Sequence, residues 1–306
     1  MSTEGGNKAI LAALAANLGI AATKFVAFAL TRSSSMLAES IHSLADSVNQ
    51  LLLLVGGRRA SREATPEHPF GYGRQRYMYA FIVSIVLFSV GGLFALYEGW
   101  HKWQHPEPIE GQWAWVPVAV LVVAIGLESF SFRTAIGEAS QVRGSAGWVE
   151  YVRSAKAPEL PVVLLEDLAA LCGLVLALFG VGLTLLTGDG RWDAAGTALI
   201  GLLLVAVAAV LAVEMGSLLV GESAGAEHLA AIEAALPGGG VERIIHMKTL
   251  HLGPDEVLVA AKIAVAATGS ARDVARTIDE AEVRIRTAVP IARVIYLEPD
   301  IDRGQG

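Results

Sequence analysis

The feature that most constrains this chain is a succession of long apolar segments. A helix needs about 20 mostly apolar residues to cross the core of a bilayer. Six stretches are long enough, at roughly residues 8–30, 35–57, 77–100, 114–136, 161–187 and 192–216. The chain is 54% hydrophobic and 17% charged, with a mean hydropathy of +0.52, whereas soluble domains are roughly 25% charged. The sequence therefore predicts an integral, multi-pass α-helical membrane protein.

The last third of the chain has a different composition, because its apolar runs are short and its charges are frequent. We predict a helix over 226–236, strands over 241–250 and 257–265, a second helix from an N-cap at Ser270 to about 287, and a strand over 291–297. This order is a small two-layer αββαβ domain of the ferredoxin-like kind. We expect a six-helix transmembrane domain at 1–221 and a cytoplasmic domain at 222–306.

The distribution of Lys and Arg predicts the orientation, since basic residues favour cytoplasmic loops. The two most basic connections contain Arg58, Arg59, Arg62, Arg74 and Arg76, and then Arg143, Arg153 and Lys156. The other connections are poor in basic residues, so both termini are expected in the cytoplasm. We expect a bacterial inner membrane. The formal net charge of −7 argues against a nucleic-acid partner.

Both the N-terminus and the cysteine content limit the possibilities further. The opening MSTEGGNK has no basic region and no small-residue cleavage site after the apolar stretch, so we interpret the first span as retained, not as a signal peptide. Cys172 is the single cysteine, which excludes an internal disulfide and a thiolate metal cluster within one chain.

Three ionisable residues interrupt the second apolar span in the stretch MLAESIHSLAD. Glu39, His42 and Asp46 fall on one face, because each helical residue turns by about 100°. Ionisable groups at membrane depth usually face the interior of the bundle or a polar path. One interpretation is a ligand face for a cation, and the other is a structural hydrogen-bond cluster between helices.

The fifth span contains two adjacent acids, Glu166 and Asp167, in the stretch VVLLEDLAALCG. An imidazole with carboxylates from two helices suits a small divalent cation, zinc above all, with manganese, iron and cobalt close behind. A proton relay or a structural carboxylate pair is the alternative. Glu128 also lies at membrane depth, and it either lines a cation path or pairs with Lys24 or Arg133. Lys24 itself is expected either to snorkel or to be paired inside the protein.

These motifs together resemble the cation diffusion facilitator family of metal exporters. The similarity rests on MLAESIHSLADSVNQ, EHPFGYGR, LLEDLAA, six spans and an αββαβ tail. The stretches SMLAESIHSLAD, RYMY and VVLLED are most similar to the zinc transporter nine branch. The resemblance implies a homodimeric secondary transporter that exchanges a divalent metal for protons by alternating access, with no cofactor and no enzymatic reaction.

The resemblance also implies which residues bind the metal. The family pattern falls on His42 and Asp46 in the second span and on Asp167 in the fifth. The other ligand of the fifth span falls on Val163, which cannot bind a metal, so Glu166, Glu39 or a water molecule is expected to complete the site. More oxygen ligands make the site harder and weaken strict zinc selectivity. His42 is the expected proton-coupling group, since an imidazole gains and loses its proton near neutral pH.

Two further family sites look incomplete. A loop site would need a second histidine beside His68, and Tyr72 stands there, so we interpret His68 as a solvated loop residue. In the tail, His246, His251 and Glu298 are available, but Lys262 and Tyr296 occupy ligand positions. We therefore expect a structural, dimerising tail.

Two rival functions are an intramembrane metal-dependent hydrolase and an organic-cation carrier. The hydrolase would be expected to carry HExxH, whereas ESIHSLAD places the acid at another spacing. An organic cation would need a wider pocket than small neighbours such as Ser43, Ala45 and Ala170 suggest.

Overall fold

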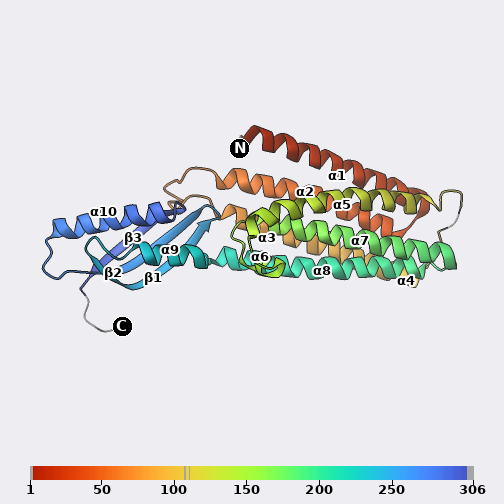
Figure 1. Cartoon of the computed structure of the whole chain (residues 1–306). Coiled ribbons are helices and arrows are strands. Elements are labelled where there is room, and N and C mark those ends of the chain that lie inside the picture. The colour runs from red at the N-terminus through yellow and green to blue at the C-terminus, as the bar shows by residue number, and fades with distance from the viewer. Residues whose placement is uncertain (1–2, 107, 110, 302–306) are drawn as a thin grey trace. The chain divides into compact units, whose positions relative to one another are not determined.

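The computed structural model describes residues 3–106, 108–109 and 111–301, with side chains from residue 17 onward. The described chain divides into two compact units (Figure 1). The first contains Met1–Gly56, Tyr79–Arg153 and Pro158–Met215, and the second contains Gly57–Met78, Ser154–Ala157 and Gly216–Gly306. The expected division at residues 221 and 222 lies between the last long helix and the first helix of the tail and stays a prediction.

The first unit is built from long helices. They are α1 (Thr3–Thr31), α2 (Ser34–Ala60), α3 (Gln75–Val86), the π-helix η1 (Leu87–Leu93), α4 (Phe94–Gln104), α5 (Val116–Arg143), the short α6 (Trp148–Ser154), α7 (Glu159–Thr187) and α8 (Arg191–Val220). Because α3, η1 and α4 are continuous, they form one span, Gln75–Gln104.

Four of these segments are by themselves long and apolar enough to cross a membrane: Gln75–Gln104, α5, α7 and α8. Within α1, Asn17–Thr31 is a shorter apolar helix. Helix α2 is more polar than these segments, because serines, acids and a histidine occupy its first half. Together α1, α2 and these four segments confirm, for the described residues, the predicted membrane fold of six helices.

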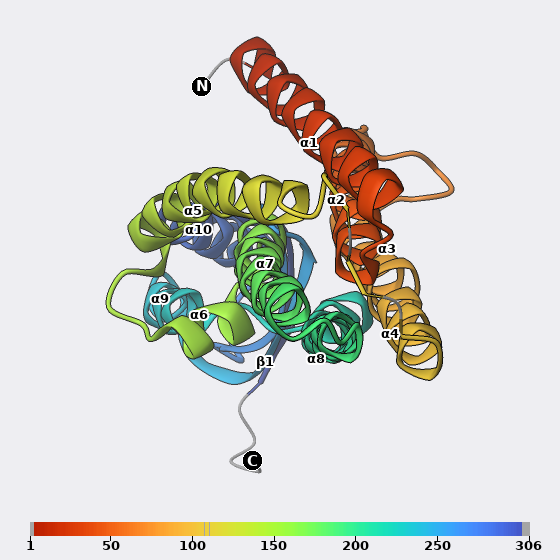
Figure 2. The same cartoon turned by 90° about the vertical axis from the view of Figure 1, so that its right-hand side faces the viewer.

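The helices of the first unit pack through small residues at their closest approaches. Helix α7 lies between α5 and α8 (Figure 2), and α5 also contacts α1. At Gly99 of α4 a Cβ atom would lie 2.8 Å from the backbone nitrogen of Ala198 in α8, so only glycine allows these two helices to approach so closely. Helix α5 continues to Arg143, beyond the apolar stretch of residues 114–136, and the short helix α6 follows it.

The second unit contains the predicted αββαβ arrangement. Its elements are α9 (Ala226–Ala235), β1 (Val241–Gly253), β2 (Glu256–Val265), α10 (Ala271–Ala288) and β3 (Ala292–Asp300). The sheet has the order β1-β2-β3, with β1 antiparallel and β3 parallel to β2. The structure thus confirms the predicted fold of the tail.

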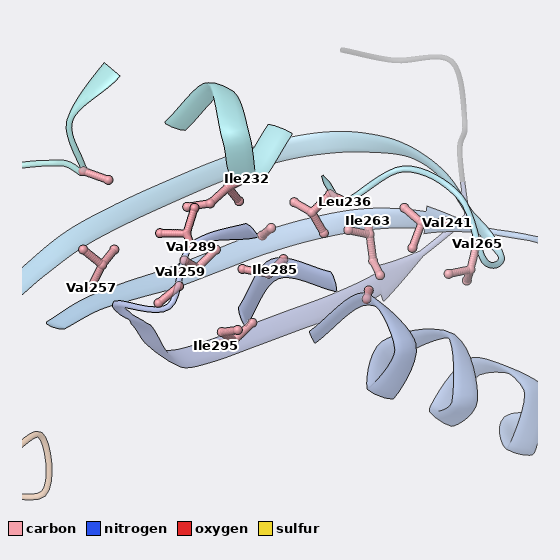
Figure 3. Packing of buried hydrophobic residues seen from close by; sticks show 14 residues of the cluster. Ile232, Leu236, Val241, Val257, Val259, Ile263, Val265, Ile285, Val289 and Ile295 are labelled. Atoms are coloured by element: carbon pink, nitrogen blue, oxygen red, sulfur yellow. The ribbon is translucent and has the colours of Figure 1, made fainter. Parts of the chain in front are cut away.

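One hydrophobic core holds this sheet and its two helices together. Side chains alternate along β2, so that Val257, Val259 and Ile263 are buried. They pack against Ile232 of α9 and Ile285 of α10 (Figure 3). The predicted N-cap at Ser270 is also present: its hydroxyl accepts a hydrogen bond from the backbone N–H of Asp273, whose carboxylate accepts one from the N–H of Ser270.

Candidate metal centre

Helix α2 buries the polar face that its sequence predicts. The side chains of Glu39 and His42 are 0% and 2% exposed, and that of Asp46 is 15% exposed. His42 Nε2 lies 3.6 Å from Asp46 Oδ2, which brings an imidazole and a carboxylate together one turn apart. Asn49 continues the same face and is fully buried.

A row of polar atoms along this face has no hydrogen-bond partner among the described residues. These atoms are Glu39 Oε1, His42 Nδ1 and Nε2, Asp46 Oδ1 and Asn49 Oδ1. Buried polar atoms in native proteins are nearly always paired with protein, water or an ion. Carboxylate oxygens, amide oxygens and imidazole nitrogens are all types of atom that bind metal ions in proteins. The face therefore has the chemistry of a cation-binding surface.

Glu39 differs from the other members of this face because a lysine already binds it. Lys24 Nζ of α1 lies 3.0 Å from Glu39 Oε2 and donates a second hydrogen bond to Ser43 Oγ at 2.8 Å. Lys24 is 1% exposed, so it is internally paired and does not snorkel. For Glu39 the structure thus shows the second interpretation of this face, a structural interaction between helices, since its carboxylate pairs with Lys24.

Helix α7 directs its two adjacent acids to different neighbours. Glu166 Oε1 accepts a hydrogen bond from Asn49 Nδ2 of α2 at 2.6 Å, whereas Asp167 Oδ2 accepts one from Ser131 Oγ of α5 at 3.0 Å. This divergence follows from the turn of about 100° between successive helical residues. Asp46 interacts electrostatically with both acids, so all three carboxyl groups belong to one charged region.

The predicted ligands are near one another but are not gathered into a coordination shell. Among the described residues, no group of three His, Cys, Asp or Glu side chains is close enough to hold a metal ion. The structure joins His42 to Asp46 and Asn49 to Glu166, and it leaves Asp167 against α5. The ligand set His42, Asp46, Asp167, Glu166 and Glu39 therefore stays a prediction.

The π-helix η1 lies beside this face. A Cβ atom on Gly91 would be 4.0 Å from His42 Nδ1 and 3.2 Å from Leu204 Cδ1. Because glycine has no side chain, η1 leaves space next to the imidazole. Single π-turns inside α-helices occur frequently at functional sites, which agrees with the position of this one.

A carboxylate from another helix caps the beginning of α2. Asp193 of α8 is fully buried and accepts hydrogen bonds from the backbone N–H groups of Ser34 and Ser35 at 2.7 and 3.3 Å. It also accepts bonds from the hydroxyls of Ser33 and Ser34 at 3.0 and 2.9 Å. A negative charge at this position stabilises the positive end of the helix dipole. Asp193 thus fixes where α2, with its polar face, begins.

The sequence interpretation does not include Asn49, Ser131 or Asp193. Asn49 could be found from sequence, because it follows Asp46 by three residues and extends the helical spacing of the face. Ser131 forms its hydrogen bond with a residue that is 36 positions away in the chain, and Asp193 forms its bonds with residues about 160 positions away. No local sequence pattern therefore identifies them.

The second unit offers no additional ligand cluster among its described residues. His68 stacks on Tyr72 with ring centroids 4.5 Å apart, in the loop where an incomplete site is expected. In the sheet, Lys262 forms ion pairs with Glu298 at 3.2 Å and Asp300 at 3.0 Å. His251 is 1% exposed, and its Nδ1 lies 3.1 Å from the carbonyl oxygen of Gly253. Each of these residues therefore has a local role in packing or pairing.

Comparison with known proteins places the chain in a family. Residues 10–220 match the family described as the cation efflux transmembrane domain. The chain is 33% identical over 265 residues to the "Proton-coupled zinc antiporter SLC30A9, mitochondrial" of Xenopus laevis, covering 86% of this chain and 47% of that protein. Identity to the human protein of the same name is 31%, over 85% of this chain and 46% of that protein.

A plant relative is more distant: the "Metal tolerance protein C4" of Arabidopsis thaliana is 25% identical, over 84% of this chain and 56% of that protein. The chain spans about half the length of the curated relatives it matches. The names of the SLC30A9 relatives describe antiporters, not enzymes. With the match over residues 10–220, these similarities confirm the predicted family: the chain belongs to the cation efflux family of membrane proteins.

Proposed function

We propose that this chain exports a divalent metal cation, zinc in the first place, in exchange for protons, with manganese, iron and cobalt as the alternative cargoes. The observation that carries the proposal is the buried row of nitrogen and oxygen atoms on α2 that have no hydrogen-bond partner in the described part of the chain. Such a row is unfavourable in a closed protein but useful to a protein that passes a cation between successive ligands. The zinc antiporters among the relatives support the choice of cargo.

The proposed cycle uses competition between metal and protons. Imidazole and carboxylate groups bind a metal only after they lose their protons. His42 and Asp46 form the first half of the site, and Glu166 and Asp167 supply the second half when α2 and α7 move together. Protons entering from the opposite side displace the metal when the site opens there. Coupling through His42 follows from the near-neutral titration of an imidazole.

The membrane arrangement is also part of the proposal. The Lys and Arg distribution supports cytoplasmic termini and a cytoplasmic tail. We propose a bacterial plasma membrane as the location, while the SLC30A9 relatives carry the word mitochondrial in their names. We further propose a homodimer in which the αββαβ tail provides a dimer contact and binds no metal. The hydrolase and the organic-cation carrier remain rivals that no described feature favours.

The test is transport in proteoliposomes under a pH gradient, with zinc, manganese, cobalt and iron offered separately. Wild type should accumulate zinc only when the gradient is present. His42→Ala and Asp167→Ala should abolish transport, and Glu166→Gln should reduce it. Asp279→Asn, an exposed acid on α10, serves as the control. Full transport by both His42→Ala and Asp167→Ala would overturn this assignment, and hydrolysis without metal movement would favour the enzyme.

A further inference from the structure

The ion pair between Lys24 and Glu39 is unusual because both of its side chains are buried in the protein. Both side chains are almost completely buried, at 1% and 0% exposure, and Lys24 Nζ lies 3.0 Å from Glu39 Oε2. Removing two charges from water is costly even when they pair, and in a membrane helix such residues usually mark an ion pathway. The pair joins α1 to the polar face of α2, one turn before His42.

Half of the Glu39 carboxylate is left unbound by this pairing. Oε1 is buried and has no hydrogen-bond partner among the described residues. It points at Gly173 of α7, where a Cβ atom would lie only 2.9 Å away. The missing side chain at Gly173 therefore makes room for this oxygen on the helix that also carries Glu166 and Asp167.

Lys24 is electrostatically connected to the rest of the charged region. Its ammonium donates to Ser43 Oγ at 2.8 Å, and Ser43 is the neighbour of His42 in the sequence. The charge of Lys24 also acts on Asp46 and on Glu128 of α5. A positive charge at this position repels any second cation bound between His42 and Asp46.

We propose that Lys24 is a tethered cation of the transport site, which holds Glu39 while the site is empty and competes with the transported metal for that carboxylate. This inference rests on the proposed function and adds a residue that sets the affinity for the cargo. Metal arriving at His42 and Asp46 weakens the hold of Lys24 on Glu39, and departure of the metal lets the ammonium return. Lys24 thereby prevents the site from binding its cargo too tightly to release it.

The proposal predicts opposite effects for the two partners. Lys24→Met removes the competing charge and frees an additional carboxylate, so zinc should bind roughly tenfold more tightly. Glu39→Gln leaves an unpaired ammonium beside the site, so zinc should bind roughly tenfold more weakly. The double variant Lys24→Met/Glu39→Gln should return to within about threefold of wild type, because neither charge remains.

The experiment is zinc titration of the purified full-length protein by calorimetry at pH 8, where proton competition is weak. Lys24→Arg should resemble wild type. Lys102→Met is the matched control, since Lys102 is also buried but donates to the backbone carbonyl of Arg32, which lies before the start of α2. If Lys24→Met does not fold, Glu39→Gln and the double variant still test the idea, because a simple ligand role for Glu39 leaves the double variant weak.

The outcomes separate the two proposals. Zinc binding by wild type that is lost in His42→Ala supports the proposed function by itself. If wild type binds zinc but Lys24→Met and Glu39→Gln shift the affinity in the same direction, or the double variant is as weak as Glu39→Gln, the role given to Lys24 is wrong. If wild type binds no divalent cation, both proposals are wrong.

Discussion

The cap that Asp193 places on α2 leads to a prediction about stability whose size follows from its contacts. Asp193→Ala removes the acceptor of two buried backbone N–H groups, those of Ser34 and Ser35. Each unsatisfied buried donor costs about 1–3 kcal/mol, and loss of a buried charge at a helix N-terminus adds up to about 2 kcal/mol. The hydroxyl of Ser34 loses less than its backbone N–H, because Thr197 Oγ1 is another hydrogen-bond partner for it at 3.1 Å. We expect the free energy of unfolding to fall by about 4 kcal/mol in total, from the unsatisfied N–H groups and the lost charge at the helix N-terminus.

The assay is thermal unfolding of the purified protein in detergent, followed by intrinsic fluorescence. Asp193→Ala should lower the apparent Tm by roughly 10 °C. Asp193→Asn retains one oxygen acceptor, so its apparent Tm should fall by about half as much as that of Asp193→Ala. The control is Asp189→Ala, an exposed acid just before α8 whose carboxylate accepts a hydrogen bond from the backbone N–H of Arg191; loss of this bond should cost about 1 kcal/mol. Equal stability of the Asp193 and Asp189 variants would refute the capping argument.

Two further predictions follow from other contacts. Gly173→Ala should destabilise the protein by about 1–2 kcal/mol, because its methyl group must displace Glu39 Oε1 from 2.9 Å; Gly182→Ala, with open space around it, should be neutral or slightly stabilising in the same unfolding assay. Burial lowers the pKa of His251, and the hydrogen bond with the carbonyl of Gly253 offsets this only in part. The unfolded chain therefore binds more protons, so the contribution of His251 to stability is complete above its unfolded pKa, about 6.5, and decreases as the pH falls. The Tm of His251→Gln should thus fall less than that of wild type between pH 8 and pH 5.5, and identical pH profiles would contradict this assignment.

Local periodicity in the sequence predicts much of the fold. The apolar run along 257–265 predicts strand β2, and the pattern Ser270 with Asp273 predicts the start of α10, because both signals lie within a few residues. The spacing of Glu39, His42 and Asp46 likewise predicts a buried face on α2, since a helix repeats every 3.6 residues. The apolar stretch of residues 114–136 does not indicate where α5 ends, because the helix continues through polar residues up to Arg143.

The partners of the site residues could not be predicted in this way. Lys24 and Glu39 are 15 residues apart, and Asn49 and Glu166 are 117 apart. Such pairs depend on how the helices pack, which a period within one helix does not specify. For the same reason the sequence leaves open which of Glu166 and Asp167 faces α2, and the hydrogen bond from Asn49 identifies Glu166 as the one that does so.

Under the proposed function, the charges along α2 favour its middle as the position of a mobile cation. At the N-terminus the helix dipole is balanced by the buried carboxylate of Asp193, and the last turn carries Arg58 and Arg59, which suit the negative end of the dipole. Both ends are therefore compensated by permanent parts of the protein. In the middle, Lys24 compensates Glu39, and among the described residues no second lysine or arginine forms an ion pair with Asp46, Glu166 or Asp167. A lysine paired with these acids would occupy their oxygen atoms permanently. A divalent cation and protons can instead bind to the same oxygen atoms in turn. In the proposed cycle, metal and protons would therefore exchange at this part of α2, where no lysine or arginine among the described residues pairs with Asp46.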